Sequence, residues 1–131
     1  MVKNTYDAIK SLLSVNLDSS VQIKDYEGEF DDPENSLIPM PAVFCIMEQG
    51  SNELDNFVEL DQKPRLYAVT SHMGGNGFNS MHTLLDDIIT ATHNQALSTN
   101  DVLFFRNFEH LITLPGMCVY SIELQINNIG G

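Results

Sequence analysis

Three side chains are spaced so that they could hold a metal ion. His82 and Asp86 lie one helical turn apart, and His93 lies about two turns further on. Imidazole and carboxylate groups are ordinary zinc ligands, but no further ligand pattern closes a site around these three. A weak ion pair between His82 and Asp86 on an exposed helix face explains the same spacing. We therefore expect no bound metal.

The glycine-rich stretch Gly74-Gly75-Asn76-Gly77 precedes a helix candidate and could receive an anion. A helix N-terminus presents free N–H groups and a positive partial charge to such a ligand. However, no Walker lysine follows the glycines, and no dinucleotide fingerprint surrounds them. We interpret the stretch as a flexible strand-to-helix connection, where glycine supplies positive φ angles.

Neither cysteine lies in a setting that favours catalysis. Cys45 and Cys118 fall in apolar, strand-like runs, whereas a stabilised thiolate needs a positive environment. We expect buried thiols, and a disulfide between neighbouring strands stays open as the alternative. No Gly-x-Ser-x-Gly elbow is present, and His72 and His110 converge with no partner. The sequence thus predicts neither an enzyme nor a cofactor.

The charge of the chain limits its partners. With 6 basic and 18 acidic residues, the formal net charge is −12, which opposes tight binding to a nucleic-acid backbone. Eleven of the acidic residues lie from Asp25 to Asp61, a span without Lys or Arg, so one side should be strongly negative. Two explanations stay open: a solvated face, or a surface that meets a basic partner or repels DNA.

The size of the chain fits a single domain. At 131 residues and 43% hydrophobic content, it can bury one core, and we assign residues 1–131 to one domain. Met1 to Asn16 carries polar residues throughout its length, and no apolar run reaches the roughly 18 residues that a membrane span needs. We therefore expect neither a signal peptide nor a membrane anchor.

Two segments show helical periodicity. Val2 to Asn16 reads as an amphipathic helix, and Ser80 to Leu97 as a second helix that Ser80 can cap. The apolar stripe of the second segment consists of Met81, Leu84, Leu85, Ile88, Thr92 and Ala96.

The remaining apolar runs have strand length or strand alternation. Ala42 to Met47 is apolar throughout, which indicates a strand buried on both faces. The other strand candidates are Val21–Asp25, Phe57–Asp61, Arg65–Ser71, Val102–Leu114 and, after a Pro115-Gly116 turn, Cys118–Ile126. This order predicts an α+β fold, with two helices packed on one face of an antiparallel or mixed sheet of four to six strands.

A loop from Phe30 to Pro41 contains three prolines, which disfavour regular structure. It also carries Leu37, Ile38 and Met40, and exposed apolar side chains on a long loop usually need a cover. They could pack on their own core or on another subunit.

Taken together, these elements resemble the small tail-terminator, or tail-completion, proteins of bacteriophages, in particular the Mu-like family of contractile-tailed phages. The matching pieces are the helix Tyr6–Leu17, the approach Leu37-Ile38-Pro39-Met40-Pro41 into the strand Ala42–Met47, the strand Arg65–Ser71, the helix from Met81 to Ile89, and the closing Gly116–Leu124. They match in element order and hydrophobicity.

The resemblance implies a virion protein that assembles in the host cytoplasm as a ring, usually a hexamer. Such a ring caps the tail tube and sheath and joins the tail to the head-neck complex. DNA passes through it as cargo without specific binding, and no membrane is involved. It would have no active site, cofactor or metal.

Two sets of residues then become candidates for assembly. A ring must bury extended segments against its neighbours, so the expected interface residues are Phe30, Leu37, Ile38 and Met40. Carboxylates could line the channel and keep passing DNA from sticking, and the candidates are Asp25, Glu27, Glu29, Asp31 and Asp32. The alternatives are another neck, connector or baseplate component, a small ligand-binding domain with a concave pocket, and, with least support, a metal-dependent hydrolase.

Overall fold

The computed structural model describes residues 2–33, 36–49, 63–74, 80–98 and 101–128. Its elements, in chain order, are helix α1 (Val2–Asn16), strand β1 (Gln22–Asp25), the 3-10 helix η1 (Glu29–Asp31), β2 (Ala42–Gln49), β3 (Lys63–Thr70), α2 (Met81–Thr92), β4 (Gln95–Ala96), β5 (Asp101–Leu114) and β6 (Met117–Asn128).

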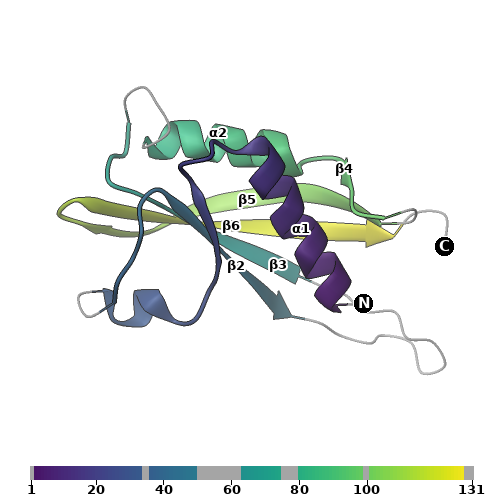
Figure 1. Cartoon of the computed structure of the whole chain (residues 1–131), viewed down its shortest axis with the longest axis horizontal. Coiled ribbons are helices and arrows are strands. Elements are labelled where there is room, and N and C mark those ends of the chain that lie inside the picture. The colour runs from purple at the N-terminus through teal and green to yellow at the C-terminus, as the bar shows by residue number, and fades with distance from the viewer. Residues whose placement is uncertain (1, 34–35, 50–62, 75–79, 99–100, 129–131) are drawn as a thin grey trace.

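The strands form one mixed sheet in the order β1-β2-β3-β6-β5-β4 (Figure 1). Strands β1 and β2 run parallel, and all other neighbours are antiparallel. The long β5–β6 hairpin, joined at Pro115-Gly116, extends beyond the end of α2 in this view. The predicted α+β class, with two helices and a mixed sheet of up to six strands, is confirmed.

The first core cluster joins both helices to alternate residues of the sheet. Ile9 and Leu13 of α1 and Leu84 and Ile88 of α2 are buried in it. The sheet contributes the side chains of Val43, Cys45, Leu66, Ala68, Leu103, Cys118, Ile122 and Leu124. Successive side chains of a strand point to opposite faces, so the residues between these belong to the other face.

The second core cluster takes those intervening residues. Ala42 and Phe44 of β2, Val69 of β3 and Val119 of β6 are buried there, and Phe30 packs on them from the segment that follows β1. Phe44 therefore lies on one face of the sheet and Val43 on the other, which confirms that β2 is buried on both faces. Both predicted buried thiols are also confirmed, because Cys45 and Cys118 are buried and free.

Helix α2 ends earlier than its apolar pattern predicts. The Ser80 hydroxyl accepts a hydrogen bond from the Thr83 N–H, as expected of a cap. The helix then stops at Thr92, because His93 is extended and Asn94 takes a positive φ of 60°. Residues Gln95–Ala96 form β4 and pair with β5, so the prediction of a helix through Leu97 is wrong in its last turn.

Other boundaries move by a few residues, and some predictions fall outside the described residues. Strand β2 runs two residues past the predicted end at Met47, to Gln49. The predicted strand Phe57–Asp61 lies outside the described ranges, as do Gly75, Asn76 and Gly77 of the glycine-rich stretch.

Candidate functional site

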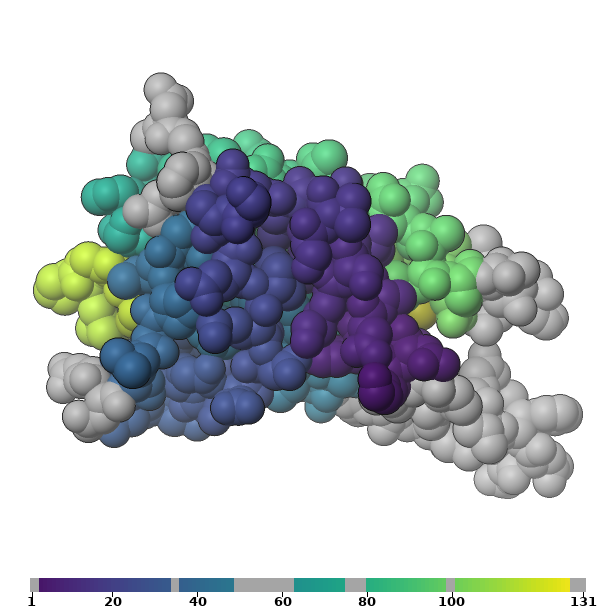
Figure 2. All heavy atoms as spheres, in the orientation of Figure 1, coloured from purple at the N-terminus to yellow at the C-terminus, as the bar shows by residue number. Residues whose placement is uncertain are grey.

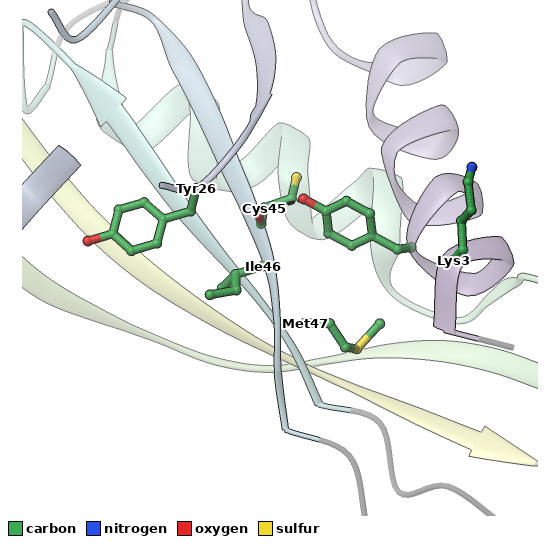
Figure 3. Close-up of a pocket in the computed structure, with 6 residues that line it drawn as sticks. Lys3, Tyr26, Cys45, Ile46 and Met47 are labelled. Atoms are coloured by element: carbon green, nitrogen blue, oxygen red, sulfur yellow. Dashed lines mark hydrogen bonds between the residues drawn. The ribbon is translucent and has the colours of Figure 1, made fainter. Parts of the chain in front are cut away.

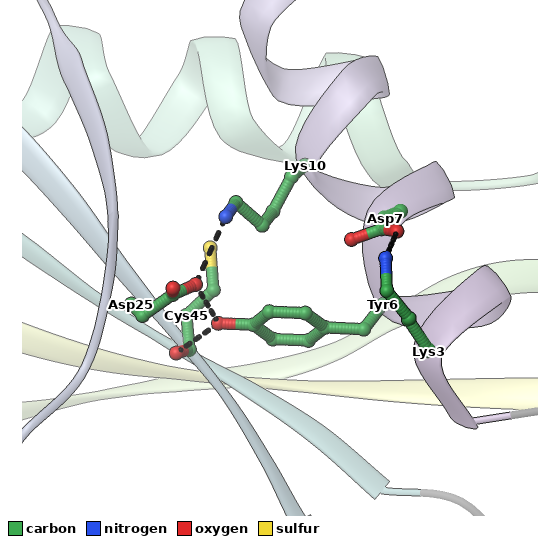
Figure 4. Close-up of polar contacts among 6 residues, drawn as sticks. All are labelled: Lys3, Tyr6, Asp7, Lys10, Asp25 and Cys45. Carbon is green, nitrogen blue, oxygen red and sulfur yellow. Dashed lines mark hydrogen bonds and ion pairs between the residues drawn. The ribbon is translucent and has the colours of Figure 1, made fainter.

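Four residues from three elements meet in a polar cluster at the junction of α1, β1 and β2 (Figure 4). The Tyr6 hydroxyl lies 2.7 Å from Oδ1 of Asp25 and 2.6 Å from the backbone oxygen of Cys45. Lys10 Nζ lies 2.9 Å from the same Asp25 oxygen. Tyr6 and Lys10 are one turn apart on α1, so a single helix face brings both to the strand carboxylate.

The contacts of this cluster favour an ionised Asp25, a protonated Lys10 and a neutral Tyr6. Hydrogen bonds from Tyr6 and then Lys10 lower the pKa of Asp25, while the bond to Asp25 raises the pKa of Lys10. Burial, followed by the hydrogen bond to Asp25, raises the pKa of Tyr6. Burial also raises the pKa of the Cys45 thiol to about 12, so the thiol is neutral near pH 7.

The polar groups of this cluster therefore form hydrogen bonds within the chain itself. The phenol has one proton for two acceptors, and the Cys45 carbonyl also accepts a bond from the Tyr26 N–H at 2.9 Å. Asp25 accepts from both α1 residues. These contacts hold α1 against the edge of the sheet, which is a structural role.

A hollow of about 510 Å³ opens beside the cluster (Figure 3). Tyr26 lies on one side of it and α1 on the other, with Ile46 and Met47 of β2 between them. Its walls are largely apolar, and the hydroxyl of Tyr6 is already bonded. A specific small-molecule site usually adds a few convergent polar groups to such walls.

The histidines considered for metal binding do not converge. His82 and Asp86 are exposed on α2, whereas the Nδ1 atom of His93 accepts a hydrogen bond from the Phe105 N–H at 3.2 Å. The ring of His93 also packs edge-on against Phe104. Among the residues that the structure describes, no group of three His, Cys, Asp or Glu side chains could hold a metal ion.

The five candidate channel acids lie in and after β1, and their surroundings differ. Asp25 is bonded within the polar cluster, and the carboxylate of Glu29 accepts a bond from the Glu27 N–H. Glu27, Asp31 and Asp32 are exposed. Asp31 forms no ion pair with any described residue, so its charge is available to a partner.

The four candidate interface residues differ in exposure: two pack on the core and two are exposed. Phe30 is only 7% exposed, and its ring packs against Tyr26, Phe44 and Tyr67. Ile38 is half-buried against the same second core cluster. Leu37 is 99% exposed and Met40 is 41% exposed. The proline-containing segment is thus held by Phe30 and Ile38 while it presents Leu37 and Met40 outward.

Strand β5 carries a second exposed apolar set, which the sequence analysis did not single out. Six successive residues, Arg106–Leu111, are exposed, and among them Phe108 is 49% and Leu111 47% exposed. The space-filling view places the hairpin, in yellow-green, at the margin of the face formed by the N-terminal segments (Figure 2). In the sequence, both faces of Val102–Leu114 carry apolar and polar residues together, and this mixture was the available signal of an exposed strand.

The outer edge of β5 is only partly paired. Strand β4 pairs with Val102 and Leu103, and His93 takes the next N–H, that of Phe105. Beyond this point, no described strand pairs with the outer edge of β5. Bulges interrupt its inner pairing with β6 at Phe105/Asn107 and at His110/Ile112.

The sequence matches no protein-family model and no curated protein. Within the described residues, no helix is long and apolar enough to span a membrane.

Proposed function

We propose that this chain is a structural subunit of a contractile phage tail, which forms a ring that terminates the tail tube and sheath and joins them to the neck. The proposal begins from the tail-terminator-like order of helices and strands. The function of such a subunit would depend on contacts between proteins and would need no catalytic group.

One observation carries the proposal: the exposure of Leu37 and Met40 on a proline-containing segment that is anchored to its own core. Phe30 and Ile38 fix this segment, so the exposed side chains are held in place for a partner. An isolated exposed leucine is unremarkable, but a second exposed pair, Phe108 and Leu111, lies on another element. A ring subunit needs two different, complementary surfaces.

The acidic residues support a channel in the same proposal. Glu27, Asp31 and Asp32 are exposed in one short stretch of a chain with a net charge of −12. Carboxylates around a lumen would repel the phosphates of passing DNA. Asp25 contributes less to this effect, because Lys10 lies 2.9 Å from its carboxylate.

Native mass spectrometry of the purified chain over a range of concentrations tests the proposal. We expect one closed oligomer, a hexamer, and a ring in negatively stained electron micrographs. Rings added to tail tubes that lack a terminator should bind at one end and stop further growth. A chain that remains monomeric at all concentrations, or rings that bind tubes along their sides, would contradict the proposal.

A further inference from the structure

The segment from Ser36 to Met40 has no regular secondary structure and pairs with no described strand. It lies outside the strands of the sheet, and its residues Leu37, Ile38 and Met40 make no backbone hydrogen bond to a described residue. The N–H groups of Leu37, Ile38 and Met40 thus have no partner among the described residues, and another strand can pair with them, whereas Pro39 has no N–H. Leu37 would supply an apolar side chain to such a contact.

The outer edge of β5 offers complementary groups. From Asn107 to Thr113 its outward N–H and C=O groups meet no described strand, and Phe108 and Leu111 expose apolar surface beside them. Open edges of this kind pair readily with another chain unless they are covered. His93 and β4 cover the first part of this edge and leave the second part open.

The charges of the two surfaces are complementary. Arg106 is exposed at the start of the open edge and forms no ion pair with a described residue. Asp31, which precedes the Leu37–Met40 segment, is also exposed and forms no ion pair with a described residue. Residues 102–114 contain one arginine and one glutamate, so they carry no net charge in a chain of −12. A second acidic copy can therefore approach here with less repulsion than elsewhere.

We propose that the Leu37–Met40 segment of one copy docks on the open edge of β5, from Asn107 to Thr113, of a second copy, with Asp31 facing Arg106. The two surfaces differ, so the contact is head-to-tail, and repetition of such a contact closes a ring when the rotation between neighbours divides a full turn. This inference rests on the proposed ring and names the residues that join its subunits. It assigns Asp31 to the subunit contact and leaves Glu27, Glu29 and Asp32 as channel candidates.

Crosslinking between two differently labelled single-cysteine variants tests the contact directly. Leu37→Cys and Leu111→Cys chains are mixed, allowed to exchange, and treated with a short bismaleimide near pH 7. The native thiols should react slowly, because both are buried and burial raises the pKa of Cys45 to about 12. We expect a mixed dimer at about tenfold or more the yield given by Val15→Cys with Leu111→Cys, since docked residues meet at a high effective concentration. Val15 is the matched control, because it is 82% exposed on α1.

Charge exchange gives the second readout. Asp31→Arg and Arg106→Asp should each raise the concentration for half-assembly about tenfold, and the double variant should restore assembly. Equal crosslinking of the Val15 control, or rings that form unchanged in both single variants, would overturn the docking contact and leave the ring intact. A wild-type chain that never assembles would instead overturn the proposed function itself.

Discussion

The polar cluster around Tyr6 and the open edge of β5 lie on different parts of one sheet and treat their polar groups in opposite ways. In the polar cluster, Lys10 and Tyr6 both donate to Asp25, and the Tyr6 hydroxyl also bonds to the backbone of β2 at Cys45. On the distal half of β5, from Arg106 to Leu111, six successive residues are exposed and the outer backbone edge has no described partner.

This contrast predicts which groups stabilise the folded monomer and which groups affect association. A group that is bonded within its own chain contributes to folding stability, and its removal should be measurable in the monomer. An exposed apolar or unpaired group contributes little to folding, so its removal should affect association instead. Four predictions sharpen this distinction, beginning with the largest expected effect.

Truncation of a buried aromatic ring should cost far more than truncation of an exposed one. Phe44 is fully buried among Tyr26 and Phe30, so Phe44→Ala should lower the free energy of unfolding by about 3–5 kcal/mol. Phe108 is 49% exposed and its ring contacts Phe105 and Tyr120, so Phe108→Ala should lower it by only about 1–2 kcal/mol. Urea denaturation of both variants, at a concentration where the chain is monomeric, measures the difference. Similar losses would mean that Phe108 supports the monomer fold and is not a docking residue.

Removal of one hydroxyl tests whether the polar cluster holds α1 in place. Tyr6→Phe keeps the ring but removes the donor to Asp25 and Cys45, so we expect a loss of about 1 kcal/mol in the free energy of unfolding. The Cys45 carbonyl keeps its bond from Tyr26, which limits the effect. Tyr120→Phe is a matched control, because no hydrogen bond of its hydroxyl is found among the described residues. An equal loss in both variants would contradict a specific role of the Tyr6 hydroxyl.

Periodicity predicted those elements whose apolar side chains all face one core. Val2–Asn16 was predicted at its observed bounds, because its buried positions repeat with the period of a helix. The same reasoning failed after Thr92, where Ala96 continued the spacing by coincidence. The chain leaves the helix at His93, and Asn94, a residue type that tolerates a positive φ, leads into β4, which joins the sheet edge.

The fate of the loop residues depended on contacts between distant segments. Phe30 and Leu37 are both apolar side chains in one loop, yet Phe30 is buried by Phe44 and Tyr67 while Leu37 is exposed. The sequence could not separate them, because the strand order that places β2 beside β3 was not predictable from either residue. The open edge of β5 was missed for the same reason: a strand becomes an edge only through the order of the whole sheet.

The boundary between the paired and the open part of β5 depends on one histidine. His93→Ala removes the acceptor of the Phe105 N–H, so we expect a loss of about 0.5–1 kcal/mol in the free energy of unfolding. Hydrogen exchange of the Phe105 amide should become faster, while exchange of Leu103, which pairs with β4, should change little. Unchanged exchange at Phe105 would show that His93 does not cover this part of the edge. His82→Ala is the matched control, because His82 is exposed on α2, the helix that ends just before His93.

The smallest effect concerns the acid side of the stability profile. The hydrogen bonds from Tyr6 and Lys10 lower the pKa of Asp25 from its ordinary 3.8. A carboxyl group with a lowered folded pKa stabilises the fold fully above its unfolded pKa, and this contribution is lost as the pH falls through the folded value. Wild-type stability should therefore fall more steeply below about pH 4 than that of Asp25→Asn, by less than about 1 kcal/mol because water screens the exposed pair. Urea denaturation at a series of acidic pH values compares the two slopes, with Asp86→Asn on the exposed face of α2 as the control. Parallel slopes for wild type and Asp25→Asn would mean that α1 is held by its apolar face alone, and that the polar cluster differs from the open edge in geometry but not in energy.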